Sequence, residues 1–313
     1  MLKYSLQRFL LMLVTLFLIA SITFFLMKLM PGSPIQNRDK LPPDVVAKIE
    51  EHYGLDKPIS IQYVNYMKNV AKGDFGQSFI GNRDVTDVIG ERIGVSARLG
   101  LQALIFGTIV GILLGIIAAL RHNTWVDYLA TVIAVLGVSV PGFVFASLLK
   151  LVFAVKLGWF PLAFWPESLF QDFSRTVLPT LALSVFVIAT VARFMRTELL
   201  EVLGSDYITL ARAKGITKPM VVAKHAVRNA LIPVITVLGP LAAALLMGTL
   251  VIERIFAIPG LGAQFVTSIN TSDYAVIMGL AIFYSTVLIV IIFIIDMLYG
   301  IIDPRIRVSG GKN

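Results

Sequence analysis

The sequence predicts an all-α membrane protein with six transmembrane helices. Hydrophobic residues make up 57% of the 313 residues and charged residues only 15%, and the mean hydropathy is +0.84. So few charged side chains cannot cover the surface of a soluble protein of this size. Six stretches are apolar enough to cross a hydrocarbon layer of about 30 Å, which takes roughly 20 helical residues. We place these spans near residues 9–30, 99–120, 128–155, 176–195, 230–252 and 275–302.

The first span follows Lys3 and Arg8, as the apolar region of a signal peptide would. The apolar run from Phe9 to Met30 is too long for such a region, and no small-residue cleavage site follows it. We therefore expect residues 1–30 to remain in the protein as a membrane anchor.

Basic residues predict the orientation of the spans. With the N-terminus inside, thirteen Lys and Arg residues lie on the inner side and three in the short outer loops. Because basic residues near short loops favour the cytoplasmic side, both termini are expected in the cytoplasm. The same asymmetry accounts for the net charge of +8. Since no base-reading motif or aromatic platform accompanies the basic residues, we expect no nucleic-acid partner.

Residues 31–97 form the long outer connection after the first span. Acidic and basic residues nearly balance in it, so we expect a small folded extracytoplasmic insert. Pro43–Glu50 reads as a helix start, and Ser60 as the N-cap of a second helix that Gly73 ends. Apolar and aromatic side chains recur there at helical spacing, which fits either self-packing of the insert or contact with substrate. They are Tyr63, Tyr66, Met67 and Val70.

Glycines and prolines predict how the spans pack. Gly107, Gly111 and Gly115 recur every four residues in the second span, which lets a neighbouring helix approach closely. In the third span, Gly137–Pro141 lacks the closing glycine of a hydrolase elbow, so we expect a helix kink there.

Pro233 and Pro240 interrupt helix bonding in the fifth span, which is tolerated only against protein or water. The spans therefore form a bundle, either around a pathway or without one.

The inner loop, residues 193–229, carries seven basic residues and three acidic ones. Ser205 is a suitable N-cap, Asp206 suits the positive end of a helix, and Gly215 suits a left-handed helix terminator. These features predict a short helix over Asp206–Lys214 and a second helix that begins after Thr217.

One face of the short helix is expected to be apolar and to lie under the membrane. That face combines Tyr207, Leu210, Ala211 and Lys214.

Little in the sequence points to an enzyme. It contains no cysteine, and its three histidines, His52, His122 and His225, are too dispersed to suggest a metal site. No phosphate-binding glycine loop followed by Lys and Ser or Thr is present. We expect no catalytic, metal or cofactor site, and no ATP hydrolysis by this chain.

Ionisable residues inside the predicted spans include Lys28, Lys150 and Asp296. Lys28 and Lys150 are near outer helix ends, where long side chains reach water, so they are expected to act as anchors. Asp296 either pairs with a basic residue of the inner loop or serves as a proton site. The second interpretation of Asp296 makes a proton-coupled secondary transporter the alternative function. A scaffold subunit without a pathway is a third class.

Several motifs carry a resemblance to a known family. Tyr207–Gly215, then His225 and Asn229–Pro233, resemble the cytoplasmic signature of the peptide-transporter branch of ABC importer permeases. Leu41–Val45 is most similar to permeases of the oligopeptide B type. Six further motifs resemble the B-type subunit of that branch: Met30–Pro34, Gly54–Pro58, Gly73–Gly76, Pro259–Gly262, Asp273–Tyr274 and Asp303–Arg307.

The resemblance implies the type I ABC importer permease fold and an ATP-driven oligopeptide importer in the bacterial inner membrane. It implies a heterodimer with a C-type permease, two cytoplasmic ATPases that bind the ATP, and an extracytoplasmic binding protein that delivers peptide. The expected domains are an N-terminal helix (1–30), the insert (31–97), a permease core (98–303) that contains the loop 193–229, and a cytoplasmic tail (304–313).

The resemblance also assigns ATPase coupling to the short inner helix and its flanks. The general permease signature begins with Glu-Ala-Ala, where this chain has Thr209–Ala211, and Val227–Arg228 replaces its later Leu-Pro pair. Gly215 matches the signature glycine. Arg212 and Lys214 either contact the ATPase or only satisfy the positive-inside bias. The implied coupling residues are Ser205, Asp206, Tyr207, Thr209, Ala211, Arg212, Ala213, Lys214 and Gly215.

Overall fold

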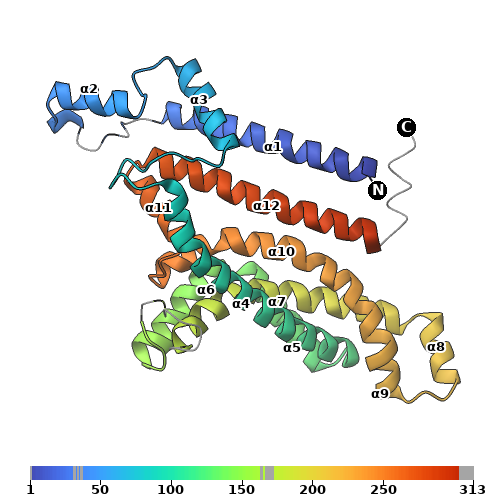
Figure 1. Cartoon of the computed structure of the whole chain (residues 1–313). Coiled ribbons are helices and arrows are strands. Elements are labelled where there is room, and N and C mark those ends of the chain that lie inside the picture. Colours follow the sequence, from blue (N-terminus) through green and yellow to red (C-terminus); the bar gives the residue numbers. More distant parts are fainter. Residues whose placement is uncertain are drawn as a thin grey trace. The chain divides into compact units, whose positions relative to one another are not determined.

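The computed structural model describes residues 2–30, 33, 35, 38–162, 165 and 173–302 (Figure 1). Its regular elements within these ranges are all helical, so the predicted all-α membrane class is confirmed. Five of the described helices are long and apolar enough to span a bilayer, and a bent helix pair brings the number to six. The predicted tail and the motif Asp303–Arg307 lie outside the described residues.

The chain packs as two compact units, residues 1–95 with 259–313 and residues 96–258. In the first unit, α1 (Leu2–Leu29) packs along α12 (Tyr274–Ile302), as Figure 1 shows in blue and red. The insert contributes η1 (Arg38–Lys40), α2 (Pro43–His52) and α3 (Ile59–Ala71), and α3 packs on α1. The grouping describes packing, whereas the domain boundaries expected from the sequence remain a prediction.

The N-cap predicted at Ser60 is wrong by two residues. Helix α3 begins at Ile59, and Pro58 occupies the N-cap position with φ −52° and ψ 144°. Proline suits this position because its ring fixes φ and because the start of a helix leaves N–H groups without helical partners in any case. Ser60 therefore lies within the first turn.

The core of the first unit joins the start of α4 (Val85–Leu120) to α11 (Leu261–Asn270) and α12. Gly279 allows this close packing, because a Cβ atom there would clash with Cγ1 of Val85. The buried cluster consists of Val85, Val88, Ile89, Leu261, Ala275, Val276 and Leu280.

In the second unit, α7 (Ser174–Leu203) is the central helix. It packs against α5 (Trp125–Ser139), α6 (Gly142–Leu149) and α10 (Val227–Ile255). Apolar side chains such as Val187, Val191 and Leu199 are fully buried on it. An apolar helix that is covered by neighbours on several faces forms the core of a bundle.

The predicted third span, 128–155, is not a straight helix. Helix α5 and the segment formed by α6 and the π-helical η2 (Lys150–Lys156) meet at an angle of 104°. The break falls at Val140 and Pro141, where the proline lacks the N–H group that would continue the helix. The kink expected from Gly137–Pro141 is confirmed.

Candidate functional site

The inner loop folds into a short helix between two turns. Helix α8 (Asp206–Ala213) follows α7 after Gly204 and Ser205, and leads through Gly215 to α9 (Lys218–Met220) and the π-helical η3 (Val221–Ala226). Gly215 has φ +79°, the left-handed conformation expected of it. Ser205 occupies the N-cap position in extended conformation.

The hydroxyl of Ser205 does not cap α8, contrary to expectation. It donates instead to the carbonyl oxygen of Val202, three residues earlier in the turn that follows α7, at 2.6 Å. The cap is therefore one of backbone conformation only.

The buried face of α8 also differs from the predicted one. Ile208 and Ala211 are buried, whereas Tyr207 and Leu210 are exposed by 42% and 56%. Helix α8 packs against η3, where Val221 and Ala226 are buried. This contact selects the side chains three residues apart that face η3, so the helix is rotated relative to the sequence-based assignment.

A polar contact adds to this packing. The side-chain amide of Asn229, at the start of α10, donates to the hydroxyl oxygen of Tyr207 at 2.8 Å. Because η3 also packs on α7 and α10, α8 is held against the ends of both long helices. The other expected coupling residues, Asp206, Thr209, Arg212, Ala213 and Lys214, are exposed.

The three glycines of α4 lie directly against α7. A Cβ atom on Gly107 would lie 2.7 Å from Cβ of Val187, and one on Gly111 would lie 2.8 Å from Cβ of Val191. On Gly115 it would lie 2.6 Å from Cβ of Met195. Distances below about 3 Å are not tolerated between real carbon atoms, so only glycine permits this helix spacing.

An ion pair that sequence reasoning missed joins α5 to the end of α7. Asp127 is 2% exposed, and its carboxylate accepts hydrogen bonds from Nε and Nη2 of Arg196 at 2.6 and 2.8 Å. The backbone N–H of Asn123 and Nδ1 of His122 lie 3.1 Å from the same carboxylate. The only sequence signal was an acid just inside a helix that follows the turn 121–124.

A second buried carboxylate joins α4 to α10. Glu253 is fully buried and accepts a hydrogen bond from the hydroxyl of Ser96 at 2.6 Å. Nearby, the ammonium of Lys150 donates to the carbonyl oxygen of Ile255. Lys150 therefore caps the end of α10 with a charge that suits a helix C-terminus, in addition to the anchoring expected of it.

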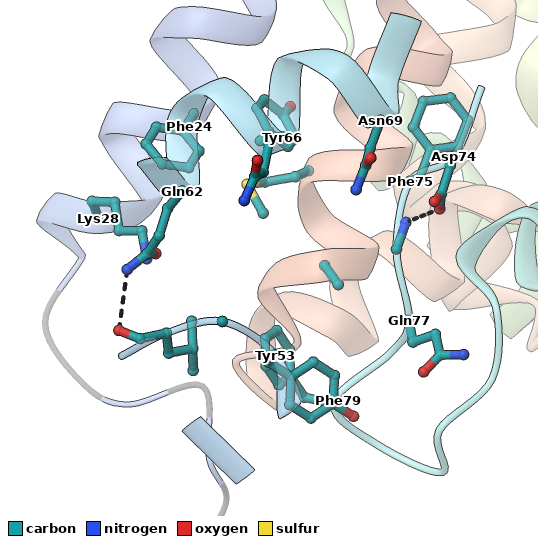
Figure 2. A pocket seen from close by; sticks show the side chains of 16 residues that line it. Phe24, Lys28, Tyr53, Gln62, Tyr66, Asn69, Asp74, Phe75, Gln77 and Phe79 are labelled. Carbon is teal, nitrogen blue, oxygen red and sulfur yellow. Dashed lines mark hydrogen bonds between the residues drawn. The ribbon is translucent and has the colours of Figure 1, made fainter. Parts of the chain in front are cut away.

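The first unit contains a cavity of about 200 Å³, which we call the insert pocket (Figure 2). It is formed by α1, residues 53–55, α3, the loop 74–79 and the start of α12. At one side the ammonium of Lys28 donates to Oε1 of Gln62. The amide nitrogen of Gln62 in turn donates to the carbonyl oxygens of Leu55 and Lys57 at 3.1 and 2.6 Å. Lys28 is thus held in place by a fixed amide.

The aromatic residues of α3 divide between packing and the insert pocket. The hydroxyl of Tyr63 is 2.8 Å from that of Ser21, and its ring stacks on Phe25. The ring of Tyr66 stacks on Phe24 at 5.3 Å, but Tyr66 also lines the insert pocket. Burial raises the pKa of Tyr66 to about 12, so its hydroxyl remains a neutral donor at physiological pH.

Among the described residues, no group of three His, Asp or Glu side chains is placed to hold a metal ion. The side chain of Asp296 lies outside the described residues.

Comparisons with known proteins identify the family. Residues 111–308 match the model of the binding-protein-dependent transport system inner membrane component. Residues 1–100 match the N-terminal component of such systems. A crystal structure described as an amino acid ABC transporter with histidines has a TM-score of 0.54 and 16% identity, over 68% of this chain and 93% of that one. This similarity supports the fold alone.

Curated relatives match over nearly their full lengths. The dipeptide transport system permease proteins DppB of Lactococcus lactis subsp. cremoris and Bacillus subtilis are 48% and 46% identical over 98% of this chain, and over 100% and 98% of their own lengths. The oligopeptide transport system permease protein OppB of Salmonella typhimurium is 41% identical over 98% of this chain and all of its own length. The chain belongs to the binding-protein-dependent transport system inner membrane components, as a B-type permease subunit of an ABC importer.

Proposed function

We propose that this chain is the B-type membrane subunit of an ATP-driven oligopeptide importer and forms half of its translocation pathway. The observation that carries the proposal is the full-length similarity to both dipeptide and oligopeptide permeases, at 41–48% identity. Since the two groups of relatives share peptide as their substrate class, peptide is the substrate class that we assign to this chain.

The family implies cytoplasmic ATPases and an external binding protein as partners. We infer that the second half of the pathway is a C-type permease, and that both termini of this chain face the cytoplasm. ATP hydrolysis is assigned to the ATPases, so the purified chain alone is expected to hydrolyse none.

The geometry of α8 supports a role in coupling. Its buried side contacts η3, and the side-chain amide of Asn229 in α10 donates a hydrogen bond to the hydroxyl of Tyr207. Its exposed side presents Tyr207, Leu210 and Arg212. When a partner displaces the exposed side of a short helix that is packed on the ends of two long helices, both long helices are displaced with it. ATP-driven closure of the ATPases would in this way favour one of two arrangements of the spans, which is alternating access.

The proton-coupled alternative lacks support, because the family consists of binding-protein-dependent components. The test is uptake of a labelled tripeptide into vesicles that contain this chain, its C-type partner and the ATPases. We expect uptake to require internal ATP and the external binding protein, and to continue when a protonophore collapses the proton gradient. Uptake without ATP, or uptake that the protonophore abolishes, would overturn the proposal.

A further inference from the structure

We propose that the insert pocket is a binding site for a short peptide, which it holds by its charged ends. This site lies in the insert and the adjoining ends of α1 and α12, and it is outside any role that the family assignment gives to the chain. The inference rests on the proposed peptide transport, because that function supplies the ligand class.

The dimensions of the insert pocket favour a small ligand. Drug-sized ligands occupy pockets of roughly 300–1,000 Å³. The volume of about 200 Å³ admits a smaller molecule or the end of a longer one. Its walls come from five chain segments, so the shape is set by the fold of the whole unit and not by one flexible loop.

Two opposite charges face each other across the insert pocket. Lys28 and Asp74 lie on opposite sides of it in Figure 2, and both line it. Within the described part of the chain, neither side chain forms an ion pair. One oxygen of Asp74 accepts the N–H of Gly76 at 2.8 Å, which fixes its orientation. A carboxylate suits the ammonium end of a peptide and Lys28 suits the carboxylate end.

Groups that suit a peptide bond lie between these charges. The hydroxyl of Tyr66 is buried and has no hydrogen-bond partner within the described residues. The ring of Tyr66 lines the insert pocket, whereas its hydroxyl is closed off from the cavity. The side chains of Asn65 and Asn69 line the same wall from α3 and offer both amide donors and acceptors.

Aromatic rings complete the insert pocket. Tyr53 and Phe79, whose ring centroids are 4.4 Å apart, form the wall opposite α3. Phe75 and Met278 add further apolar surface to the lining. Such surfaces accept side chains of varied shape, whereas charged ends and the peptide bond are common to all short peptides. The arrangement therefore selects peptides as a class without reading one sequence.

The experiment measures binding of dialanine to the purified complex of this chain, its C-type partner and the ATPases in nanodiscs, without binding protein. Equilibrium dialysis of labelled dialanine gives the affinity. We expect Lys28→Gln and Asp74→Asn each to weaken binding roughly tenfold, the effect of losing one charge-assisted hydrogen bond.

Matched variants control for damage to the fold. Tyr63→Phe removes a hydroxyl from α3 at a residue that does not line the insert pocket. Lys68→Gln removes an exposed charge from the same helix, also outside the insert pocket. Both should bind dialanine as the unchanged complex does.

Blocked peptides assign each end. N-acetyl-dialanine should bind more weakly than dialanine to the unchanged complex, and Asp74→Asn should cause no further loss for it. Dialanine amide, which lacks the carboxylate end, should also bind the unchanged complex more weakly than dialanine, and Lys28→Gln should cause no further loss of its affinity.

The inference is wrong if the complex binds no dialanine, or if binding is the same in all pocket variants. It is also wrong if these variants weaken only the docking of the binding protein. In each of these cases, ATP-dependent peptide uptake in vesicles would leave the proposed function standing, whereas a complex that transports no peptide fails on the function itself.

Discussion

Asp273 and Ser78 are 195 positions apart in the sequence, yet the serine hydroxyl donates to the buried carboxylate at 2.5 Å. The backbone N–H of Phe79 donates to the other carboxylate oxygen at 3.2 Å. Asp273 directly precedes α12, so it fastens the loop that carries Phe79 to the start of the last helix. One side of the insert pocket depends on this attachment.

Replacement of Asp273 by Ala should loosen that loop. The change leaves the backbone N–H of Phe79 without its acceptor, at a cost of about 1–3 kcal/mol, while the hydroxyl of Ser78 keeps the carbonyl oxygen of Ile80 as an acceptor at 2.8 Å. Limited proteolysis between residues 74 and 84 and thermal unfolding of the complex measure the effect. Ser78→Ala is the control, because it keeps the hydrogen bond from the backbone N–H of Phe79 to Asp273 and should therefore loosen the loop less. Equal protease resistance in all three proteins would contradict the expectation.

Gly111→Leu should disrupt the packing of α4 on α7. The added side chain would enter the space of Val191, and overpacking of this kind costs about 1–3 kcal/mol. Gly94→Leu is the matched control, since no atom lies within 4 Å of a Cβ at that position of the same helix. The measurement is the melting temperature of the complex. A similar loss in both variants would show that close approach at Gly111 is not the cause.

Arg196→Met should destabilise the second unit by leaving the carboxylate of Asp127 buried without its main partner. Breaking a buried pair from one side costs about 3–5 kcal/mol. Arg193→Met, one turn earlier on α7 and exposed, should change little. Because uncharged residues of similar size can replace both members of a buried pair, Asp127→Leu in addition to Arg196→Met should recover much of the stability. Thermal unfolding without such recovery would argue against an unpaired charge as the cause.

Gly215→Val should uncouple the ATPases. Its φ of +79° strains a branched side chain, so the turn after α8 must change and re-aim the helix. We expect the complex to reach the membrane but to show weaker ATPase attachment, or ATP hydrolysis that no longer responds to loaded binding protein. Gly204→Val is the control, because Gly204 has φ −85° and a Cβ atom there would make ordinary contacts, 3.5 Å from the carbonyl oxygen of Glu201. Normal attachment, stimulation and uptake in Gly215→Val would exclude the coupling role.

The predicted orientation can be tested with single cysteines, since the chain has none. In cells whose inner membrane is intact, a thiol reagent that cannot cross that membrane should label a cysteine at the exposed position Gln77. It should label a cysteine at Thr217 only after the inner membrane is permeabilised. The reverse pattern would show that the insert faces the cytoplasm.

Local sequence features predicted the local structure well. Gly215 is left-handed, the third span breaks at Pro141, and α2 begins at Pro43. Each of these depends on the backbone preferences of one or two residues, which are visible without a fold.

The contacts that the sequence did not reveal join distant segments. Arg196 and Asp127 are 69 positions apart, and Glu253 and Ser96 are 157 apart. The rotation of α8 likewise depends on η3, and the insert pocket depends on five segments that meet only in the fold. No spacing rule for a single helix contains this information.

The glycines of α4 restrict how that helix can move along α7. Gly107, Gly111 and Gly115 advance by four residues, and so do Val187, Val191 and Met195, the side chains that they receive. Four helical residues rise about 6 Å, so the side chains of α7 meet glycines of α4 only when the helices are shifted along each other by multiples of that distance. At intermediate shifts these side chains would clash with larger residues of α4. A slide of an ångström or two is thereby blocked. During a transport cycle α4 and α7 are expected to travel together as one rod, and any change of shape must arise where α7 meets its other neighbours.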